Sequence, residues 1–419
     1  MERVIMHSDL NSCFAAIECL YNPKIRALPV AVCGDPELRQ GIVIAANQVA
    51  KGHGINVGKD TIGSAKQKCP KINIVLPRQG LYDKFCLWTR EIYNKHSDYV
   101  EPYGPDGCWL DVTNIVRDKY DAQLLADEIR AEIKETLGIT CSVGAGFNKT
   151  SSKIASELKK PDATTVITRE TYKDIVWPLP PDKLLGVDSK TKRILYAMGI
   201  TDIGNIAKAP IELFEDIFGK NGRTLHLYAS GEEKSPVKHK NYVEPTKSIG
   251  HTATTYRDMT TLEDVKREIY ALSEKVTSRM REQHIKCETV QISLRENDLK
   301  WVERQGTLEM PAFLTDTIAK KALEIFEARY KFAKPLRSIG VKVCNFVPDT
   351  VGIQNSLFDD IAQDLKSDKL AHTLDTLRSM YGYNIIQRGI VLEDRKLTYV
   401  PTDYNRSGYK VGSAFFKDA

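Results

Sequence analysis

Two aspartates in this sequence sit where a metal ion could bind. Residues 3–8 form an apolar run that ends in Asp9, and Asp106 lies where two short strands within residues 101–111 meet at a Gly-Pro turn. Carboxylates are the ligands that hard divalent cations prefer, and such a cradle suits a cation that carries a nucleoside triphosphate. Gly107 stands where a third carboxylate would complete the site.

The bulk composition predicts a multidomain protein of ordinary make-up. The chain has 419 residues, too many for one compact core, with 42% hydrophobic and 27% charged residues. No apolar run approaches the roughly 20 residues of a membrane span, and the N-terminus lacks a signal sequence, so we expect a cytoplasmic protein and no membrane partner. The nine cysteines form no CxxC pair, which predicts buried thiols. A net charge of +5 permits nucleic-acid binding without arguing for it.

Strands and helices alternate over the first 165 residues, which predicts an α/β unit. Apolar residues at helical spacing predict a helix over 120–137, and residues 140–146 predict a strand that runs into a lysine-rich helix. The glycines Gly144 and Gly146 invite a dinucleotide-binding interpretation. A third glycine and an acidic residue about twenty positions further on are missing, so we give it little weight.

The remainder of the chain divides by its pattern into four parts. Residues 166–230 predict short helices, and the polar, charged stretch 231–245 predicts a linker. Residues 246–348 follow the order β-α-β-β-α-β, which indicates a small two-layer sheet domain. The tail, 349–419, contains one predicted helix over 361–380.

Two regions indicate DNA binding, each with an ordinary alternative. Residues 184–195 predict an apolar helix, a Gly186-Val187 turn and a second helix with Lys190, as in a helix-hairpin-helix whose backbone amides hold a DNA phosphate. Any helical hairpin gives a similar pattern, and Asp188 stands where such hairpins favour a second glycine. On the sheet domain, Lys247, Arg257 and Lys300 indicate either a solvated face or a surface along a phosphate backbone.

These features together resemble the Y-family translesion DNA polymerases of the bacterial DNA polymerase IV (impB/mucB/samB) type. Residues 7–16, His-Ser-Asp-Leu-Asn-Ser-Cys-Phe-Ala-Ala, are similar to the opening motif of that family. Residues 106–111, Asp-Gly-Cys-Trp-Leu-Asp, are similar to its Asp-Glu motif, and the Lys160-Pro161 end and the sheet domain also match. The two motifs at this separation are specific, whereas either one alone would be weak.

The resemblance implies an α+β multidomain fold shaped as a right hand with an additional little-finger domain. The implied parts are a palm (1–10 and 75–165), fingers (11–74), a helical thumb with the helix-hairpin-helix (166–230), a linker (231–245), a little finger (246–348) and a tail with a clamp-binding peptide (349–419).

The resemblance also implies an activity, a metal and a set of site residues. The family adds deoxynucleotides to a primer 3′ end opposite damaged template bases, using two Mg²⁺ ions, for which Mn²⁺ can substitute. Matching positions give metal ligands in Asp9, the Leu10 carbonyl and Asp106, a ring that excludes a ribose 2′-hydroxyl in Phe14, and nucleotide contacts in Gln48, Lys51 and Lys160. The expected partners are primer-template DNA, a deoxynucleoside triphosphate and a sliding clamp, which would bind Gln354, Leu357 and Phe358; nothing requires more than a monomer.

Three departures from the family pattern converge on one site. Gly107 replaces the catalytic glutamate, and Gln48 and Lys51 replace a tyrosine and an arginine that contact the triphosphate. The metal ion at the primer hydroxyl would lose one of three carboxylates. Asp111 lies roughly 13 Å along the strand and cannot substitute, whereas the sequence leaves Glu101 open as a substitute.

Two functions therefore stay open at the level of sequence. One is a translesion DNA polymerase weakened by Gly107. The other is a clamp-tethered DNA-binding protein that has lost catalysis and occupies primer ends. A third interpretation, a Rossmann-like metabolic enzyme, fails on the incomplete glycine motif.

Overall fold

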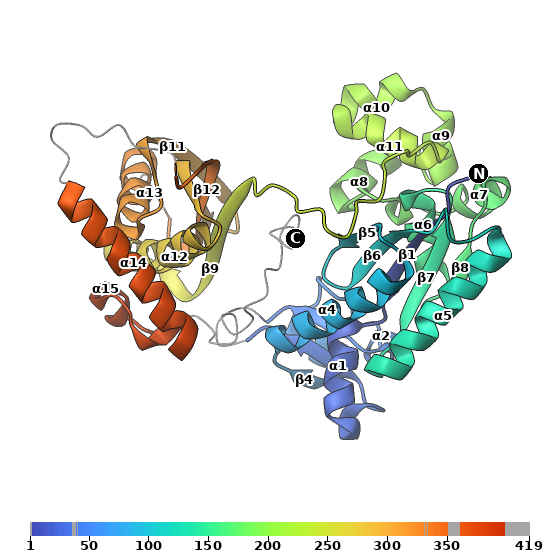
Figure 1. Ribbon diagram of the computed structural model, residues 1–419, viewed down its shortest axis with the longest axis horizontal. Coiled ribbons are helices and arrows are strands. Elements are labelled where there is room, and N and C mark those ends of the chain that lie inside the picture. Colours follow the sequence, from blue (N-terminus) through green and yellow to red (C-terminus); the bar gives the residue numbers. More distant parts are fainter. Residues whose placement is uncertain are drawn as a thin grey trace.

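A central sheet of five strands organises the N-terminal half of the chain. The computed structural model describes residues 2–35, 39, 41–330, 332, 334–350 and 361–398, and Figure 1 shows two bodies joined by an extended segment. In the larger body the strand order is β5-β6-β1-β7-β8. The bounds are Ile5–Leu10 for β1, Val100–Tyr103 for β5, Gly107–Asp111 for β6, Cys141–Gly146 for β7 and Thr164–Val166 for β8.

Helices cover both faces of this sheet. Helices α1 (Cys13–Tyr21), α4 (Gln79–His96) and α5 (Lys119–Leu137) share one core with the strands. Helix α6 (Lys149–Leu158) packs on the opposite face of β7, and Asn148 begins it by accepting a hydrogen bond from the Ser151 amide at 2.8 Å. The strand–turn–strand hairpin predicted around Asp106 is present as β5 and β6.

The predicted fingers have a sheet and a core of their own. Strands β2 (Val30–Cys33), β3 (Val43–Ala46) and β4 (Asn73–Val75) form it, with helices α2 (Gln48–Gly52) and α3 (Ile62–Lys68). Helix α1 was expected in this part, but its apolar side chains pack into the core of the five-stranded sheet. The separate core of the fingers therefore begins after α1, not at residue 11.

Short helices form the predicted thumb. They are α7 (Arg169–Val176), α8 (Ser189–Ala197), α9 (Ile203–Lys208), α10 (Ile211–Phe218) and α11 (Lys220–Ser230), around a core that includes Leu195 and Phe214. The apolar helix expected before Gly186 is absent. A single 3₁₀ turn, Pro181–Lys183, stands there instead, and Gly186, whose φ is 85°, cannot continue a right-handed helix.

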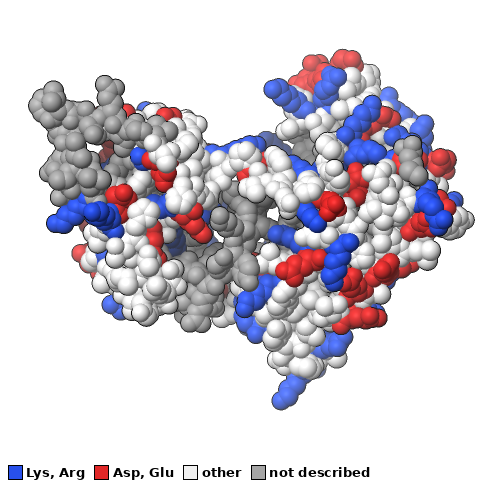
Figure 2. Space-filling model, in the orientation of Figure 1, with Lys and Arg blue, Asp and Glu red and all other residues white. Residues whose placement is uncertain are grey.

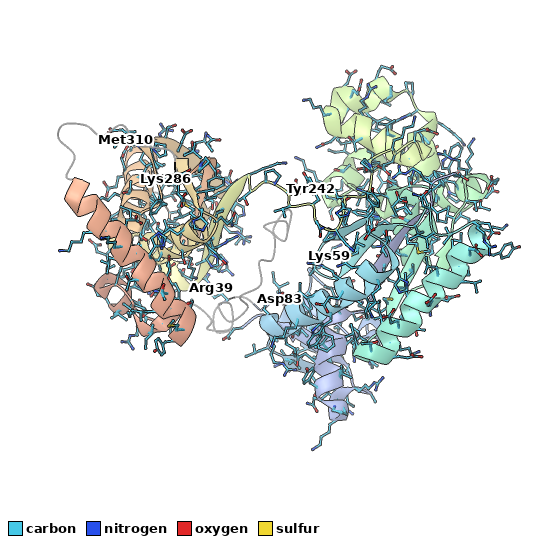
Figure 3. All side chains as sticks on the ribbon, viewed as in Figure 1. Arg39, Lys59, Asp83, Tyr242, Lys286 and Met310 are labelled. Atoms are coloured by element: carbon cyan, nitrogen blue, oxygen red, sulfur yellow. The ribbon has the colours of Figure 1, made fainter. Side chains whose placement is uncertain are left out.

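The predicted linker is anchored to the larger body along most of its length. The Arg3 guanidinium donates to the Lys234 and Ser235 carbonyls at 3.2 and 2.9 Å, and Glu101 accepts from the Lys238 amide at 2.9 Å. Val237 is buried against Ile5 and Trp109 in a small apolar cluster. The stretch after Lys240, which includes Tyr242 (Figure 3), connects the two bodies along the chain.

The smaller body is the predicted little finger. Its sheet has the order β11-β10-β12-β9, with helices α12 (Leu262–Glu282) and α13 (Thr315–Arg329) on one face. The strand bounds are Ser248–Met259 for β9, Ile285–Glu296 for β10, Trp301–Ala312 for β11 and Leu336–Pro348 for β12. The predicted β-α-β-β-α-β order is confirmed. An ion pair of 2.5 Å between Arg39 and Asp258 gives the two bodies a second contact (Figure 3).

The described part of the predicted tail packs against the little finger. It comprises α14 (Ile361–Tyr381), a 3₁₀ turn (Tyr383–Ile385) and α15 (Gly389–Leu392). Arg281 pairs with Asp375 at 2.6 Å, Arg378 pairs with Glu274 at 3.0 Å, and Leu397 is buried in the little-finger core. The tail was expected to be a separate part of the chain, and residues 366–398 correct that expectation.

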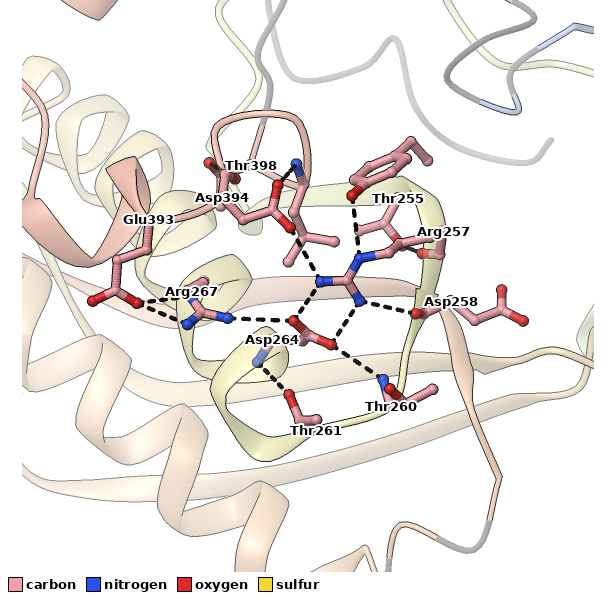
Figure 4. Close-up of polar contacts among 12 residues, drawn as sticks. Thr255, Arg257, Asp258, Thr260, Thr261, Asp264, Arg267, Glu393, Asp394 and Thr398 are labelled. Carbon is pink, nitrogen blue, oxygen red and sulfur yellow. Dashed lines mark hydrogen bonds and ion pairs between the residues drawn. The ribbon is translucent and has the colours of Figure 1, made fainter.

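Arg257 takes part in the same packing. Its guanidinium donates to both oxygens of Asp264 at 2.8 and 2.7 Å and to Asp394 at 3.1 Å (Figure 4). The hydrogen bond from Arg257 is the main reason that the pKa of Asp264 falls to about 2. Arg257 therefore has a structural role in the little finger, and its predicted contact with DNA stays a prediction.

The lowered pKa of Asp264 predicts a pH-dependent contribution to stability. Relative to an ordinary aspartate, the charged form stabilises the fold by roughly 2 kcal/mol. Because the folded-state pKa is depressed, this contribution is present above about pH 4 and disappears as the pH falls towards 2. We expect Asp264→Asn to lower the local free energy of opening of β9 and α12 by about that amount at pH 7, and by less near pH 3. Native-state hydrogen exchange on the whole chain measures both values.

A matched control lies in the same domain. Asp298 pairs with Lys334 at 2.7 Å on the surface, so Asp298→Asn should change stability by less than about 1 kcal/mol. Equal losses in the two variants would show that the Arg257–Asp264 pair has no special weight.

Candidate active site

The two aspartates meet because β1 pairs with strands on both sides. Asp9 lies opposite Gly107 on β6 and opposite Ser142 on β7. The Leu10 amide donates to the Asp106 carbonyl at 3.2 Å, which fixes the hairpin turn beside the end of β1. A cavity of about 550 Å³ opens there, and its wall includes Asp9, Leu10, Phe14, Lys51, Asp106 and Lys160.

Charge and burial shift the pKa values of the two carboxyl groups in opposite directions. Desolvation, followed by the negative charge of Asp9, raises the pKa of Asp106 to about 6. Burial also raises the pKa of Asp9, but the charges of Lys153 and Lys160 outweigh it and leave that pKa below its ordinary range. The site is thus a pair of acidic groups that repel each other, which favours the binding of a cation between them.

The lysines reach this site because α6 lies unusually close to β7. A Cβ atom on Gly144 would lie 2.2 Å from both the Ser152 carbonyl oxygen and the Ser156 nitrogen. Only glycine fits this approach, and it brings Lys153 and Lys160 to Asp9. The glycine pair that invited a dinucleotide-binding interpretation therefore allows α6 to pack closely on β7.

Gly107 leaves the site without a third carboxylate. Among the described residues, no three His, Cys, Asp or Glu side chains lie close enough together to hold a metal ion. The two aspartates and the Leu10 carbonyl fit one divalent cation, to which phosphate oxygens would add further ligands. A second cation lacks a protein carboxylate.

The two acids considered as substitutes are engaged elsewhere. Glu101 binds the Lys149 ammonium at 2.6 Å and the Lys238 amide. Asp111 accepts from the Thr113 hydroxyl at 2.6 Å, at the far end of β6. Neither is available to the cavity.

The hairpin backbone has also closed over Gly107. A Cβ atom there would lie 2.7 Å from the Tyr103 carbonyl oxygen and 3.3 Å from both Asp9 Oδ1 and His7 Nε2. His7 is buried, its Nδ1 lies 2.9 Å from Ser156 Oγ, and its Nε2 has no hydrogen-bond partner in the described part of the chain. Burial, with the charges of Lys153 and Lys160, holds its pKa well below the ordinary range, so the ring is neutral.

The predicted nucleotide contacts divide into those on the cavity and one beside it. The Phe14 ring stacks on Tyr82 with centroids 4.4 Å apart and planes 10° apart. Lys51 donates to Ser12 Oγ at 2.9 Å on the cavity wall. Gln48 lies about one turn earlier on α2, exposed and off the wall.

Sequence reasoning missed three charged residues of the site. Lys59, labelled in Figure 3, lines the cavity from the fingers. Lys153 and Glu157 lie on α6 beside Asp9 and Lys160. The sequence contained a signal for two of them. Lys153, Glu157 and Lys160 are spaced by four and three residues, which places them on one face of a helix.

The remaining predicted DNA contacts are accessible. Gly186 has a positive φ of 85° and lies exposed before α8, with Val187 half-buried and Lys190 exposed. Asp188 caps α8 and accepts from the Thr191 amide at 2.7 Å. The side chains of Lys247 and Lys300 are 73% and 74% exposed, and each lies near a carboxylate, Glu244 at 3.7 Å and Asp298 at 3.8 Å. Figure 2 shows basic and acidic side chains interspersed over both bodies. The predicted clamp-binding residues Gln354, Leu357 and Phe358 lie outside the described residues.

Known proteins match the chain along nearly its whole length. The model of the impB/mucB/samB family matches residues 8–157, and the model of its C-terminal domain matches residues 246–357. The DNA polymerase IV of Acetivibrio thermocellus is 42% identical over 96% of this chain and 100% of its own length. The chain belongs to the impB/mucB/samB family of Y-family DNA polymerases. The DNA polymerase IV of Clostridium acetobutylicum, another relative, is 32% identical over 94% of this chain and 99% of its own.

A solved structure agrees with this family. A Y-family DNA polymerase chimera matches with a TM-score of 0.73 and 25% identity, over 82% of this chain and 99% of its own. The predicted family and the multidomain α+β fold are confirmed. Membership of the family implies use of a divalent metal. In the described ranges, no helix is long and apolar enough to cross a membrane.

The close packing of α6 on β7 gives a second prediction. Gly144→Ala places a Cβ atom against the α6 backbone, which cannot yield as a flexible side chain does, so we expect a loss of at least about 3 kcal/mol in the free energy of unfolding. Urea denaturation measures it.

Gly63→Ala is the matched control, because its new Cβ would meet only Thr61 Oγ1 at 3.7 Å. Its stability should stay level or rise by up to about 1 kcal/mol. If both variants are as stable as the parent chain, α6 moves away at no cost and the site does not depend on this packing.

Proposed function

We propose that this chain is a DNA-directed DNA polymerase that adds deoxynucleotides to a primer end opposite damaged template bases. The observation that carries the proposal is the convergence of Asp9, Asp106 and Lys160 on one cavity in a chain of this family. The Phe14 ring lies on the same wall, and we expect it to exclude a ribose 2′-hydroxyl.

The chain's own residues supply binding and orientation. Asp9, Asp106 and the Leu10 carbonyl would hold Mg²⁺, or Mn²⁺ in its place. When bound, such a metal lowers the pKa of the primer hydroxyl and neutralises charge on the triphosphate. Lys51 and Lys160 face the same space and offer ammonium groups to phosphate oxygens. The Phe14 ring is fixed because Tyr82, on which it stacks, donates to buried Glu18 at 2.6 Å.

The open face of the little-finger sheet suits the DNA backbone. Small residues line its middle, where a Cβ atom on Gly340 would lie 2.4 Å from the oxygens of Ser293 and Thr252. Arg295 lies over the Trp301 ring at 5.5 Å on the same face. The exposed cations Lys247 and Lys300, together with the backbone amides around Gly186 and Lys190 of the thumb, would add phosphate contacts.

Gly107 keeps a second function in view, a DNA-binding protein of the same fold that occupies primer ends with little catalysis. The observation that favours it is the missing third carboxylate. Primer extension with Mg²⁺ and with Mn²⁺ separates the two functions, because only a polymerase lengthens the primer. The same assay with ribonucleotides and Phe14→Ala tests the excluding ring.

The third prediction compares Gly107→Glu with Gly107→Gln. The structure alters the design of this test, because any side chain at Gly107 must first displace the Tyr103 carbonyl. Glutamine carries the same steric cost without the charge, so the ratio of the two rates reports the carboxylate alone. We expect Glu to extend primers about tenfold or more faster than Gln, the scale of one recovered interaction at a metal site. Equal rates would mean that a carboxylate at residue 107 does not limit the reaction.

We also propose that the chain is a monomer in the cytoplasm and that the segment with Gln354, Leu357 and Phe358 docks on a sliding clamp, with the two apolar side chains as anchors. The fourth prediction is that Leu357→Ala with Phe358→Ala abolishes clamp binding in surface plasmon resonance and leaves extension of short primers unchanged. Loss of both activities together would give these residues a structural role instead.

A further inference from the structure

Four charged side chains of alternating sign lie together beside the end of α6, and two of them, Asp9 and Lys160, line the cavity. The Lys160 ammonium donates to Asp9 and also to Glu157 at 2.8 Å. Lys153 lies 2.8 Å from the same Glu157 oxygen and 3.8 Å from Asp9. Glu157 is therefore shared by both lysines that face Asp9.

This arrangement places an ammonium group on a carboxylate that would hold the metal. The Lys160 and Asp9 side chains are only 24% and 16% exposed, so water screens their contact weakly. A divalent cation bound at Asp9 repels the ammonium of Lys160 and competes with it for the negative charge of the carboxylate. Lys160 then needs another partner near the cavity.

Glu157 is already in contact with that ammonium. It precedes Lys160 by three residues at the end of α6, so the pair keeps its geometry when Asp9 is taken. Burial raises the pKa of Glu157, but the charges of Lys153 and Lys160 outweigh it and keep the pKa below the ordinary range. The carboxylate is thus ionised and ready to hold a cation at neutral pH.

We propose that Glu157 is a positioning residue that receives Lys160 from Asp9 when a divalent cation binds and holds it on the cavity wall, facing the triphosphate. This inference rests on the proposed function, because it assigns the site to a metal and a nucleotide. Glu157 also supplies local negative charge. Without it, the acidic side chains Asp9 and Asp106 would face the four lysines Lys51, Lys59, Lys153 and Lys160.

Metal binding without DNA or nucleotide tests the proposal directly. Electron paramagnetic resonance counts free Mn²⁺ as it is titrated into the whole chain. We expect Glu157→Gln to weaken Mn²⁺ binding tenfold or more, the effect of removing a partner of a metal-ligand residue. The matched control is Glu132→Gln, a palm glutamate that pairs with Lys95 at 2.5 Å and His96 at 2.9 Å away from the cavity, and it should bind as the parent chain does.

A double variant shows whether Glu157 acts through Lys160. Lys160→Gln alone should bind Mn²⁺ more tightly than the parent chain, because the competing ammonium is gone. In that background Glu157→Gln should weaken binding by less than about threefold. Equal effects of Glu157→Gln in the two backgrounds overturn the proposal, since Glu157 would then act through bulk charge alone.

Primer extension gives an independent readout. Glu157→Gln should raise the Mg²⁺ concentration for half-maximal rate and the nucleotide KM, with little change in kcat at saturating metal, and Glu157→Asp should recover part of the loss. If the parent chain extends no primer but the Mn²⁺ results hold, the proposed function fails and the inference stands. If the parent chain binds no Mn²⁺ in the millimolar range, the inference is overturned.

Discussion

The antiparallel pairing of β1 with both β6 and β7 is the constraint on which the site depends. It sets Asp9 opposite Gly107 on one side and opposite Ser142 on the other. A slip of one residue in either pairing would turn the Asp9 side chain to the opposite face of the sheet. The same register places Gly144 under α6, and the close approach of that helix delivers the lysines. The positions of the two aspartates and of the lysines near them thus follow from the pairing of β1 with a strand on each side.

Local patterns predicted the carboxylates, and distant packing decided the rest. Asp9 and Asp106 were identified because a strand end and a hairpin turn are written in short stretches of sequence. Glu157 was missed, because its relation to Asp9 depends on how closely α6 lies on β7. The glycine pair that permits this approach was visible and was considered as a nucleotide motif, since spacing alone does not say whether a glycine faces a phosphate or a helix.

The packing of the linker and of the tail was not predicted, for a related physical reason. Both are rich in charge, and charge in a sequence usually indicates solvent. Here Glu101 holds the Lys238 amide, and Arg281 holds Asp375 across 94 residues of sequence. Partners so far apart leave no local pattern. Such ion pairs contribute modestly to stability but are specific in geometry. They therefore determine the position of the tail on the little finger more than they stabilise its packing there.

Gly107 lacks a carboxylate and also has no room for a side chain. The hairpin backbone occupies the space that a side chain would need, with the Tyr103 carbonyl oxygen 2.7 Å from the site of a Cβ atom. Among the remaining charges, Lys160 pairs with both Asp9 and Glu157, and Glu157 also pairs with Lys153. A site with one carboxylate fewer holds a metal less tightly, so a competing ammonium on Asp9 matters more here than beside a complete set of three. Lys160 must therefore have a second carboxylate partner when a metal ion binds Asp9. Among the described residues of α6, Glu157 is the acid that provides one.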